Sequence, residues 1–423
     1  MKLIIKNGRY INPATGADDI LDVYVEDGLV KEVAKNIEKD ADKIEDATGC
    51  IVIPGLIDLH THLREPGFEH KETIISGCEA AAAGGYTTIC AMPNTKPACD
   101  SVDTVKYILD KAADAKVNVL PIGAVTKGQQ GKELADIKGM KEAGICAISE
   151  DGKSVMDAAL YKEAMEIAAK ENLPVFAHCE EITMVKGCVV NAGKLADALG
   201  VGGVSNDVED VIATRDIGLS LMTGARLHLC HCSTKESVNY IKEGKAQGAY
   251  LTAEICPHHF VLTEDMVDLN DSNYKMNPPV RTKADVEALK NGIKEGIIDA
   301  ISTDHAPHAK DEKDKGFLNA PCGIVGLETA FALSYTYLVK EGYIDLKRLV
   351  EMMSCNPAKI LETDKGDISV GKPADIAIID IDNAYKIDIN KFHSKSNNSP
   401  FDGYEVFGKI KRTIVNGNVV YEA

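Results

Sequence analysis

The sequence lacks any apolar run approaching the ~18 residues of a membrane-spanning helix, and its N-terminus lacks the layout of a secretion signal. The sequence has 47 Lys and Arg but 65 Asp and Glu, which gives a net charge of −18. This excess of negative charge argues against nucleic acids and anionic membranes as partners. The 12 cysteines form no Cys-x-x-Cys pair. Without an export signal, we expect reduced thiols and a cytoplasmic protein.

Both ends of the chain alternate apolar and polar residues as β-strands do, at residues 3–5 and 20–34 and again over 367–420. Asn-Gly and Asp-Gly turn signals separate these stretches. Neither end is large enough to close a core alone. We therefore predict one small β-sandwich domain built from both chain termini, residues 1–53 plus 366–423, in preference to two unrelated β appendages.

The central region, residues 54–365 of the 423, alternates apolar strands with amphipathic helices. Eight candidate strands occur at 51–59, 86–92, 117–125, 145–149, 174–178, 226–232, 249–256 and 299–303. Helical patterns are clearest at 102–114, 157–171, 207–223, 234–246, 283–296 and 324–340. Eight β-α units predict an α/β fold with a (β/α)8 TIM-like barrel. An open doubly wound sheet is the alternative, but no Gly-x-Gly-x-x-Gly turn follows the first strand.

One stretch places candidate metal ligands at a strand end. Asp58, His60 and His62 follow the apolar run 51–53, and strand alternation projects all three side chains the same way. Two neutral imidazoles on one face can share a metal ion. An inert, hydrogen-bonded polar pair is the alternative, which only further histidines at the same place would exclude.

In a barrel, the C-terminal ends of all strands meet at one mouth. Polar residues occupy most of these ends: His60, His62, Asn94, Glu150, Asp151, His178, His231, Asp304 and His305. Four of these histidines, at 60, 62, 178 and 231, with the two aspartates suit two ions bridged by a carboxylate and a hydroxide better than one tetrahedral zinc. Divalent metal lowers the pKa of bound water towards ~7, so we expect hydrolysis of amides or esters. Two long interruptions, about 179–206 and 257–282, lie at the same mouth.

Three cysteines flank the later histidines: Cys179, Cys230 and Cys232. If His178 and His231 point into the barrel, alternation turns these cysteines towards the helices. We interpret them as packing residues and expect no thiolate site.

Two motifs make the comparison with a known family specific. The segment Asp58–Arg64 and the segment Ser302–His308, followed by Lys313, resemble the signature motifs of the dihydroorotases, in their long bacterial (class I) form, within the amidohydrolase superfamily. The resemblance covers essentially the whole chain. It implies reversible cyclisation of N-carbamoyl-L-aspartate to L-dihydroorotate, in de novo pyrimidine biosynthesis, through attack of a metal-bridging hydroxide on a cyclic amide.

The resemblance also implies a ligand set: His60, His62 and Asp304 for one ion, His178 and His231 for the second, and Asp151 as the bridge. Many relatives use a carboxylated lysine as the bridge, but strand four has none, and the long bacterial forms use an aspartate. Glu150 and Lys153 are the competing candidates. We expect Zn²⁺, one or two ions per subunit with two the expectation, although the Irving–Williams order does not fix the metal.

Substrate contacts follow from the same resemblance: Arg64, Asn94 and His308 for the carboxylate, Asn277 and the Cys322–Gly323 backbone for the ring, and His62 beside them. An arginine fork suits a planar carboxylate. For Arg64 the alternative is a surface ion pair with Glu65. Asp304 would take a proton from the hydroxide and deliver it to the leaving ring nitrogen. Residues 305–320 are expected to form a mobile loop over the mouth.

Two other functions stay open. One is another cyclic amidase, such as a hydantoinase, dihydropyrimidinase or allantoinase, which generally lacks an arginine at the position of Arg64. The other is a non-catalytic subunit that partners aspartate transcarbamoylase, although here every ligand position is filled. The family implies a homodimer and is compatible with an aspartate transcarbamoylase complex.

Overall fold

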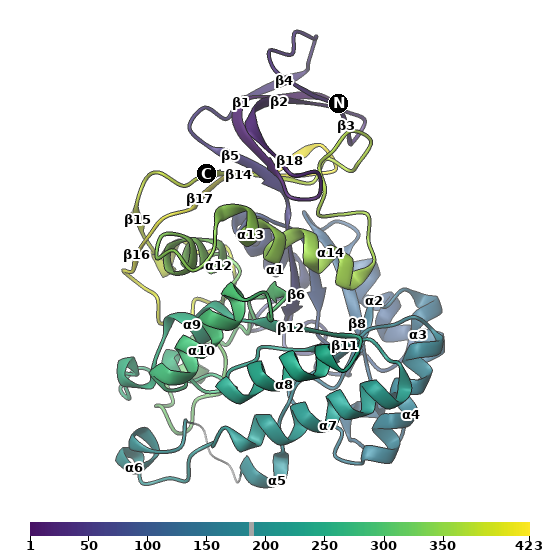
Figure 1. Cartoon of the computed structure of the whole chain (residues 1–423), viewed down its shortest axis with the longest axis vertical. Helices are drawn as coiled ribbons and strands as arrows, with labels where there is room; N and C mark the ends of the chain where they lie inside the picture. Colours follow the sequence, from purple (N-terminus) through teal and green to yellow (C-terminus); the bar gives the residue numbers. More distant parts are fainter. Residues whose placement is uncertain (186–189) are drawn as a thin grey trace.

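The computed structural model describes residues 1–185 and 190–423, and its central feature is a nearly closed ring of parallel strands. Eight strands pair in chain order: β6 Leu56–Thr61, β7 Tyr86–Ala91, β8 Asn118–Ala124, β9 Ala147–Ser149, β10 Val175–Ala177, β11 Leu227–Leu229, β12 Leu251–Ile255 and β13 Ala300–Ile301. A parallel bridge between Thr61 and His305 joins the last strand end to the first. The predicted (β/α)8 barrel is confirmed (Figure 1).

Helices cover the outside of the barrel. The larger ones are α1 Ile74–Ala83, α2 Val102–Ala112, α3 Ile137–Ala143, α4 Ala158–Lys170, α7 Asp207–Thr223, α8 Lys235–Ala246 and α10 Lys283–Lys294. After β13 the chain forms α12 Ala330–Ser334, the π-helical η4 Tyr335–Val339, α13 Leu346–Val350, the π-helical η5 Glu351–Cys355 and α14 Asn356–Leu361. Among the described residues, no helix is long and apolar enough to cross a membrane.

Strands from both termini form a second sheet, which lies at one end of the molecule (Figure 1). Its members are β1 Lys2–Asn12, β2 Ala17–Glu26, β3 Leu29–Ala34, β4 Lys43–Asp46, β5 Ile51–Pro54, β14 Ile376–Asp380, β17 Lys409–Val415 and β18 Asn418–Glu422. The sheet encloses its own apolar core, which includes Ile5, Val23 and Ile376. Because β5 pairs antiparallel with β14, the two termini share one sheet and are not separate appendages. A small pair, β15 Tyr385–Lys386 and β16 Glu405–Val406, lies beside it.

The prediction of one barrel strand over residues 51–59 is wrong, because this segment forms two strands that belong to different sheets. β5 pairs within the terminal sheet, and β6 begins the barrel after Gly55. Gly55 packs so closely that a Cβ there would lie 2.2 Å from the Thr87 side chain. The apolar run continues through this crossing because both sheets bury it, so hydrophobicity alone does not reveal the break.

The helix expected over 324–340 begins only at Ala330. Ile324 instead forms a bridge with His305, and its carbonyl accepts the Ala306 N–H at 2.8 Å, while residues 327–329 form a turn. This contact lays the chain against the end of β13, at the barrel mouth.

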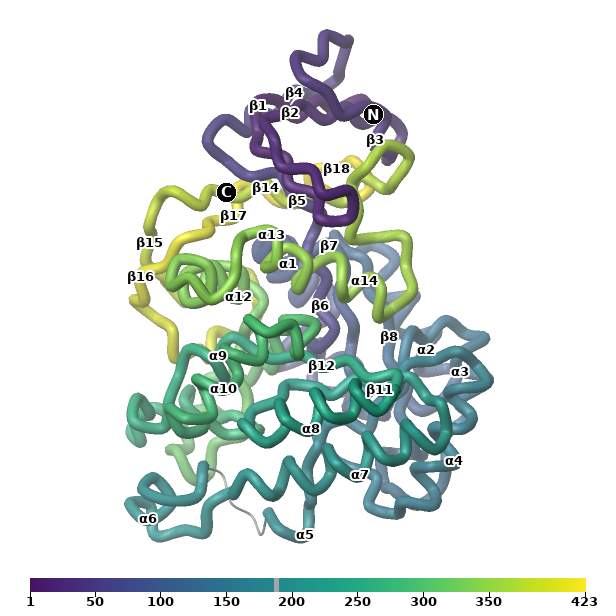
Figure 2. The backbone as a smooth tube through the Cα atoms, in the orientation of Figure 1, coloured from purple at the N-terminus to yellow at the C-terminus, as the bar shows by residue number. Residues whose placement is uncertain are grey.

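The two long interruptions follow β10 and β12 as expected. The first contains α5 Ile182–Val185 and α6 Lys194–Leu199, and its residues 186–189 lie outside the described part of the chain. The second contains α9 Pro257–Val261, η2 Glu264–Met266 and η3 Ser272–Tyr274. Figure 2 shows α5 and α6 at the end of the molecule farthest from the terminal sheet. The remaining short helices are η1 Lys127–Gln129, α11 Lys310–Lys313 and η6 Ile389–Lys391.

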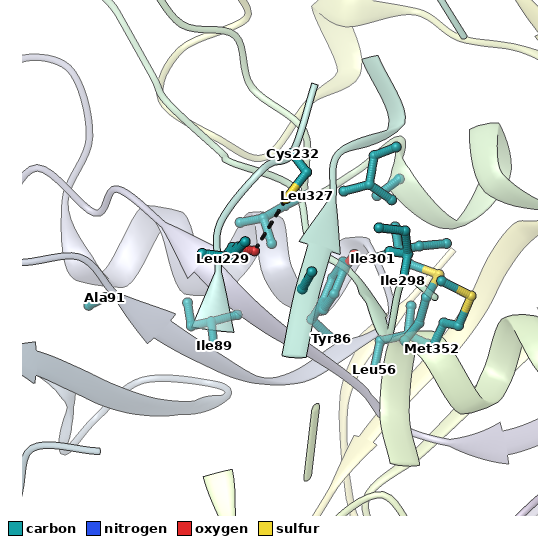
Figure 3. Close-up of a cluster of buried hydrophobic side chains, with 14 of the residues drawn as sticks. Leu56, Tyr86, Ile89, Ala91, Leu229, Cys232, Ile298, Ile301, Leu327 and Met352 are labelled. Atoms are coloured by element: carbon teal, nitrogen blue, oxygen red, sulfur yellow. Dashed lines mark hydrogen bonds between the residues drawn. The ribbon is translucent and has the colours of Figure 1, made fainter. Parts of the chain in front are cut away.

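The largest apolar cluster packs the strands against the helices; Figure 3 shows part of it, with Leu229, Ile301 and Met352 among the labelled residues. Each of these side chains is at most 1% exposed. Close packing of this kind resists displacement of the strands. The side chains at the strand ends are therefore carried on a rigid frame.

Candidate metal centre

The first group of candidate ligands comes from the ends of β6, β9 and β13. His60 Nε2 lies 3.2 Å from Asp151 Oδ1, and His62 Nε2 lies 3.0 Å from Asp304 Oδ1. The crossed distances, His60 to Asp304 and His62 to Asp151, are both 3.6 Å. All four side chains are buried. Residues 60, 62, 151 and 304 thus meet at one point of the barrel mouth.

The second group comes from the ends of β10 and β11. His178 Nδ1 and His231 Nε2 are 2.9 Å apart, and each lies 3.7 Å from Asp151 Oδ1. Asp151 therefore belongs to both groups, as a bridging ligand would. The competing residues bond elsewhere: Glu150 accepts the Thr126 N–H at 3.0 Å, and Lys153 Nζ donates to a backbone carbonyl.

The donor atoms fit divalent metal ions. His60 Nε2 and Asp151 Oδ1 are buried and have no hydrogen-bond partner among the described residues. Buried polar atoms of this kind are normally satisfied. Two sets of three donors each lie within 4.8 Å of one another: residues 60, 62 and 151, and residues 151, 178 and 231. Imidazole nitrogen and carboxylate oxygen are ligands of zinc and of related divalent ions.

Neighbouring side chains fix the tautomers that such ligation needs. His60 Nδ1 donates to Glu254 Oε1 at 3.0 Å, which leaves Nε2 free to bind metal. His62 Nδ1 donates to Asn94 Oδ1 at 2.9 Å, with the same result. His178 is reversed: its Nε2 donates to Glu180 Oε2 at 2.9 Å and leaves Nδ1 facing Asp151. Metal-ligating histidines characteristically have such partners.

The sequence analysis missed Glu254 and Glu180 as supporting residues. Burial alone would raise the pKa of Glu254, but hydrogen bonds from His228 and His60 outweigh it and lower that pKa, so the carboxylate stays ionised. The sequence did contain a signal for Glu254, because it is an acidic residue within the otherwise apolar segment 249–256. Glu180 follows His178 by two positions, and nothing in the sequence alone distinguishes it from a surface residue.

A cavity of about 220 Å³ opens beside the two groups. Its walls are formed by His62, Arg64, Asn94, Asp151, Gly152, His178, His231, Asn277, Asp304, Ala306, Cys322 and Gly323. Among the expected site residues, the walls lack only His60, which is buried beside Asp151 at 3.2 Å, and His308, which lies behind Arg64. A larger surface groove between α7 and α8 contains none of these residues.

Arg64 points into this cavity and is not paired with its neighbour Glu65. Its Nε donates to the Pro307 carbonyl at 3.1 Å, and its Nη2 lies 3.3 Å from His308 Nε2. Glu65 instead accepts the Ile74 N–H at 3.0 Å. Burial lowers the pKa of Arg64 to about 10, so the guanidinium is charged at neutral pH. The alternative of a surface ion pair is therefore wrong.

His308 lies behind Arg64 as a neutral imidazole. Its Nε2 donates to the Cys322 carbonyl at 2.8 Å, and Lys71 Nζ lies 3.4 Å from its Nδ1. Burial, with the nearby Arg64 and Lys71 charges, lowers the pKa of His308 to about 2. Lys71 is a positive group near the pocket that the sequence analysis missed.

The expected direction of Cys230 is wrong, although it does pack in an apolar cluster. Its Sγ lies within 4.8 Å of ligand atoms of His60 and Glu254, so the thiol points into the barrel. β11 ends at Leu229, and His231 has a positive φ of 34°. Strand alternation therefore breaks at His231: Cys230 faces inward as His228 does, and His231 also turns inward. Cys179 and Cys232 lie in the cluster between strands and helices, as expected.

The segment 305–320 follows the end of β13, lines the pocket through Ala306 and contains the short helix α11. Two buried lysines hold it through backbone carbonyls. Lys313 Nζ donates to Pro321 at 3.1 Å and to Gly323 at 3.0 Å, and Lys275 Nζ donates to the carbonyl of residue 318 at 2.9 Å. The expected mobility of this loop stays a prediction.

Comparison with known proteins shows that this chain is similar to dihydroorotases over its whole length. A dihydro-orotase-like family model matches residues 49–237, and an amidohydrolase family model matches residues 253–421. A dihydroorotase of Acetivibrio thermocellus is 46% identical over 99% of this chain and 98% of its own length, and one of Geobacter metallireducens is 47% identical over 100% of both chains.

The similar solved structures include cyclic amidases. An L-hydantoinase (dihydropyrimidinase) from Arthrobacter aurescens has a TM-score of 0.88 at 28% identity, covering 99% of this chain and 96% of that chain. A D-hydantoinase (dihydropyrimidinase) from Thermus sp. has a TM-score of 0.86 at 26% identity, covering 100% and 96%.

Proposed function

The chain belongs to the dihydroorotase family, and from this premise we infer that it is a dihydroorotase, which cyclises N-carbamoyl-L-aspartate to L-dihydroorotate and opens the ring in reverse. The observation that carries the inference is Arg64. A half-buried, charged guanidinium faces the same cavity of about 220 Å³ as the candidate metal ligands. A substrate with a carboxylate beside a cyclic amide matches both features.

We propose that two zinc ions bind the chain, one held by His60, His62 and Asp304 and the other by His178 and His231, with Asp151 between them. The unpartnered Nε2 of His60 and the carboxylate shared by both groups support this assignment. When bound, such ions polarise a carbonyl group and make water a nucleophile at neutral pH.

Asp304 is the proposed proton carrier. Burial would raise its pKa, but the nearby His62 and His60 side chains lower it, so the carboxylate is ionised and can accept a proton. It would take a proton from the attacking water and pass it to the ring nitrogen that leaves. In the biosynthetic direction the same carboxylate moves the proton the other way.

The substrate would lie in the cavity, with its carboxylate and its ring contacting different residues of the cavity wall. Arg64 and Asn94 would hold its carboxylate, and the Pro307 carbonyl, beside His308, accepts a hydrogen bond from Arg64 Nε at 3.1 Å and keeps the guanidinium in place. The other contacts would come from His62, the Asn277 side chain and the Cys322–Gly323 backbone. The charged fork gives a reason why substrates with a carboxylate would be preferred over those without one.

Hydantoinase activity is the second candidate, because the similar solved structures include hydantoinases. Relatives of much higher identity are dihydroorotases, and the candidate bridge here is an aspartate. A non-catalytic role beside aspartate transcarbamoylase is disfavoured because all the ligand positions are filled. A homodimer, a complex with that enzyme and a cytoplasmic location stay predictions.

Arg64→Ala tests the substrate assignment. A hydrogen-bonded pair with a charged group contributes about 1.5–3 kcal/mol, so kcat/KM for dihydroorotate should fall at least about tenfold. The control is Arg9→Ala, which removes an exposed ion pair with Asp18 in the terminal sheet and should leave kcat/KM unchanged. Unchanged kcat/KM in the Arg64 variant would overturn the carboxylate pocket.

A further inference from the structure

The side chain of Asn398, far along the chain from the barrel strands, is built into the wall of the pocket. Its Oδ1 accepts the His308 N–H at 3.1 Å. Its Nδ2 donates to the carbonyls of Ala306 at 3.2 Å and Gly323 at 3.0 Å. The Asn398 carbonyl accepts the Val325 N–H at 3.0 Å. The residue is buried at 4% exposure, so these bonds are sheltered from water.

The atoms that Asn398 contacts belong to two different segments of the wall. Ala306 and His308 follow the end of β13, whereas Gly323 and Val325 come after the segment that contains α11. The segments approach so closely that a Cβ on Gly323 would lie 2.7 Å from the Ala306 Cβ. One carboxamide therefore joins both segments and sets the distance between them.

The segment that carries Asn398 is also tied to the chain around Arg64. The Ser394 hydroxyl donates to the Glu72 carboxylate, and the Ser396 hydroxyl donates to the Lys71 carbonyl at 2.7 Å. Glu72 in turn contacts His305 Nε2 at 3.4 Å, one residue after Asp304. Residues 394–398 thus link all three backbone segments that form this side of the pocket.

We propose that Asn398 is a positioning residue for the substrate: its carboxamide fixes the spacing between the segment of His308 and the segment of Cys322–Gly323. The inference rests on the proposed function and extends it to a residue of the C-terminal segment. Only an amide side chain suits this place, because two carbonyls require two N–H donors while one N–H requires an acceptor. A carboxylate would place negative oxygen against carbonyl oxygen.

The test compares Asn398→Asp with Asn397→Asp in the metal-restored full-length protein. Asn397 is exposed and adjacent, so its variant carries the same chemical change away from the pocket. In the Asn398 variant, KM for dihydroorotate should rise about tenfold, as expected when hydrogen bonds of this kind are lost. Its kcat and bound metal should stay close to those of the control, because Asn398 touches no candidate metal ligand.

A pH series adds a result that general loss of structure would not give. The carboxyl group introduced by Asn398→Asp would be neutral at low pH and could then donate one hydrogen bond to a carbonyl. The KM ratio between the two variants should therefore shrink as the pH falls. If Asn398→Asp does not fold, Asn398→Ser against Asn397→Ser carries the KM comparison.

The outcomes separate the two levels of the proposal. If the wild type is active and both Asn398 variants match their controls in KM, the inference is overturned and the proposed function stands. A fall in kcat and bound metal with unchanged KM would also overturn it. An inactive, metal-loaded wild type would overturn the proposed function and the inference together.

Discussion

Asp304→Asn separates proton transfer from metal binding. Asp304 Oδ1 lies 3.0 Å from His62 Nε2 and 3.6 Å from His60 Nε2, and asparagine keeps an oxygen of the same size there. The amide cannot accept a proton. Loss of a positioned acid–base group costs about 10²–10⁴-fold, so we expect kcat to fall by that range, or about 2.7–5.4 kcal/mol in activation free energy.

Metal binding should survive the same substitution. His60, His62 and Asp151 still supply three donors within 4.8 Å of one another, and the second group is untouched. Metal content is measured by elemental analysis after reconstitution, and ring opening of dihydroorotate by ultraviolet absorbance. Asp311→Asn, an exposed change in the same loop, is the control and should behave as the wild type. A near-normal kcat in Asp304→Asn with metal bound would refute the proton-carrier role.

Two further predictions concern metal affinity and stability. Glu254→Gln removes the carboxylate that accepts the His60 Nδ1–H at 3.0 Å. Chelator competition should therefore show about 10–100-fold weaker metal binding than for the exposed control Glu163→Gln. Equal metal affinities in the two variants would exclude a supporting role of Glu254 in metal binding. Burial raises the pKa of Asp210 to about 7, which favours its neutral form in the folded protein, so its contribution to stability is lost as pH rises from about 4 to 7. Thermal unfolding of Asp210→Asn should depend less on pH over that window than the wild type, and parallel curves would contradict this.

The sequence predicted the barrel well because its signals are local. The buried strands are short apolar runs, and α7 spans the predicted residues 207–223. The meeting of residues 60, 62, 151, 178, 231 and 304 follows from the rule that parallel strand ends share one face. Once the fold is inferred, chain positions far apart become neighbours without further information.

Structural features that depend on backbone conformation or on contacts between distant segments could not be predicted from the sequence. Cys230 faces inward as His228 does, and His231 joins it at the mouth through a backbone turn of positive φ, which no hydrophobic pattern reveals. The apolar run 51–59 hides a crossing between two sheets at Gly55. Asn398 lies 75 residues from Gly323 in a polar stretch that resembles any surface loop. The contacts of Asn398 can be identified only from the folded structure, in which residues 394–398 pack against the barrel mouth.

The most direct test is an assay of the metal-restored wild-type protein on dihydroorotate, with hydantoin and allantoin as alternative substrates. A carboxylate-binding pocket beside a metal centre predicts ring opening confined to dihydroorotate, lost when metal is removed and restored when zinc is added back. Turnover of hydantoin in place of dihydroorotate would keep the barrel and the metal centre but contradict the substrate. No turnover of any of the three, with metal bound, would contradict the enzymatic function itself.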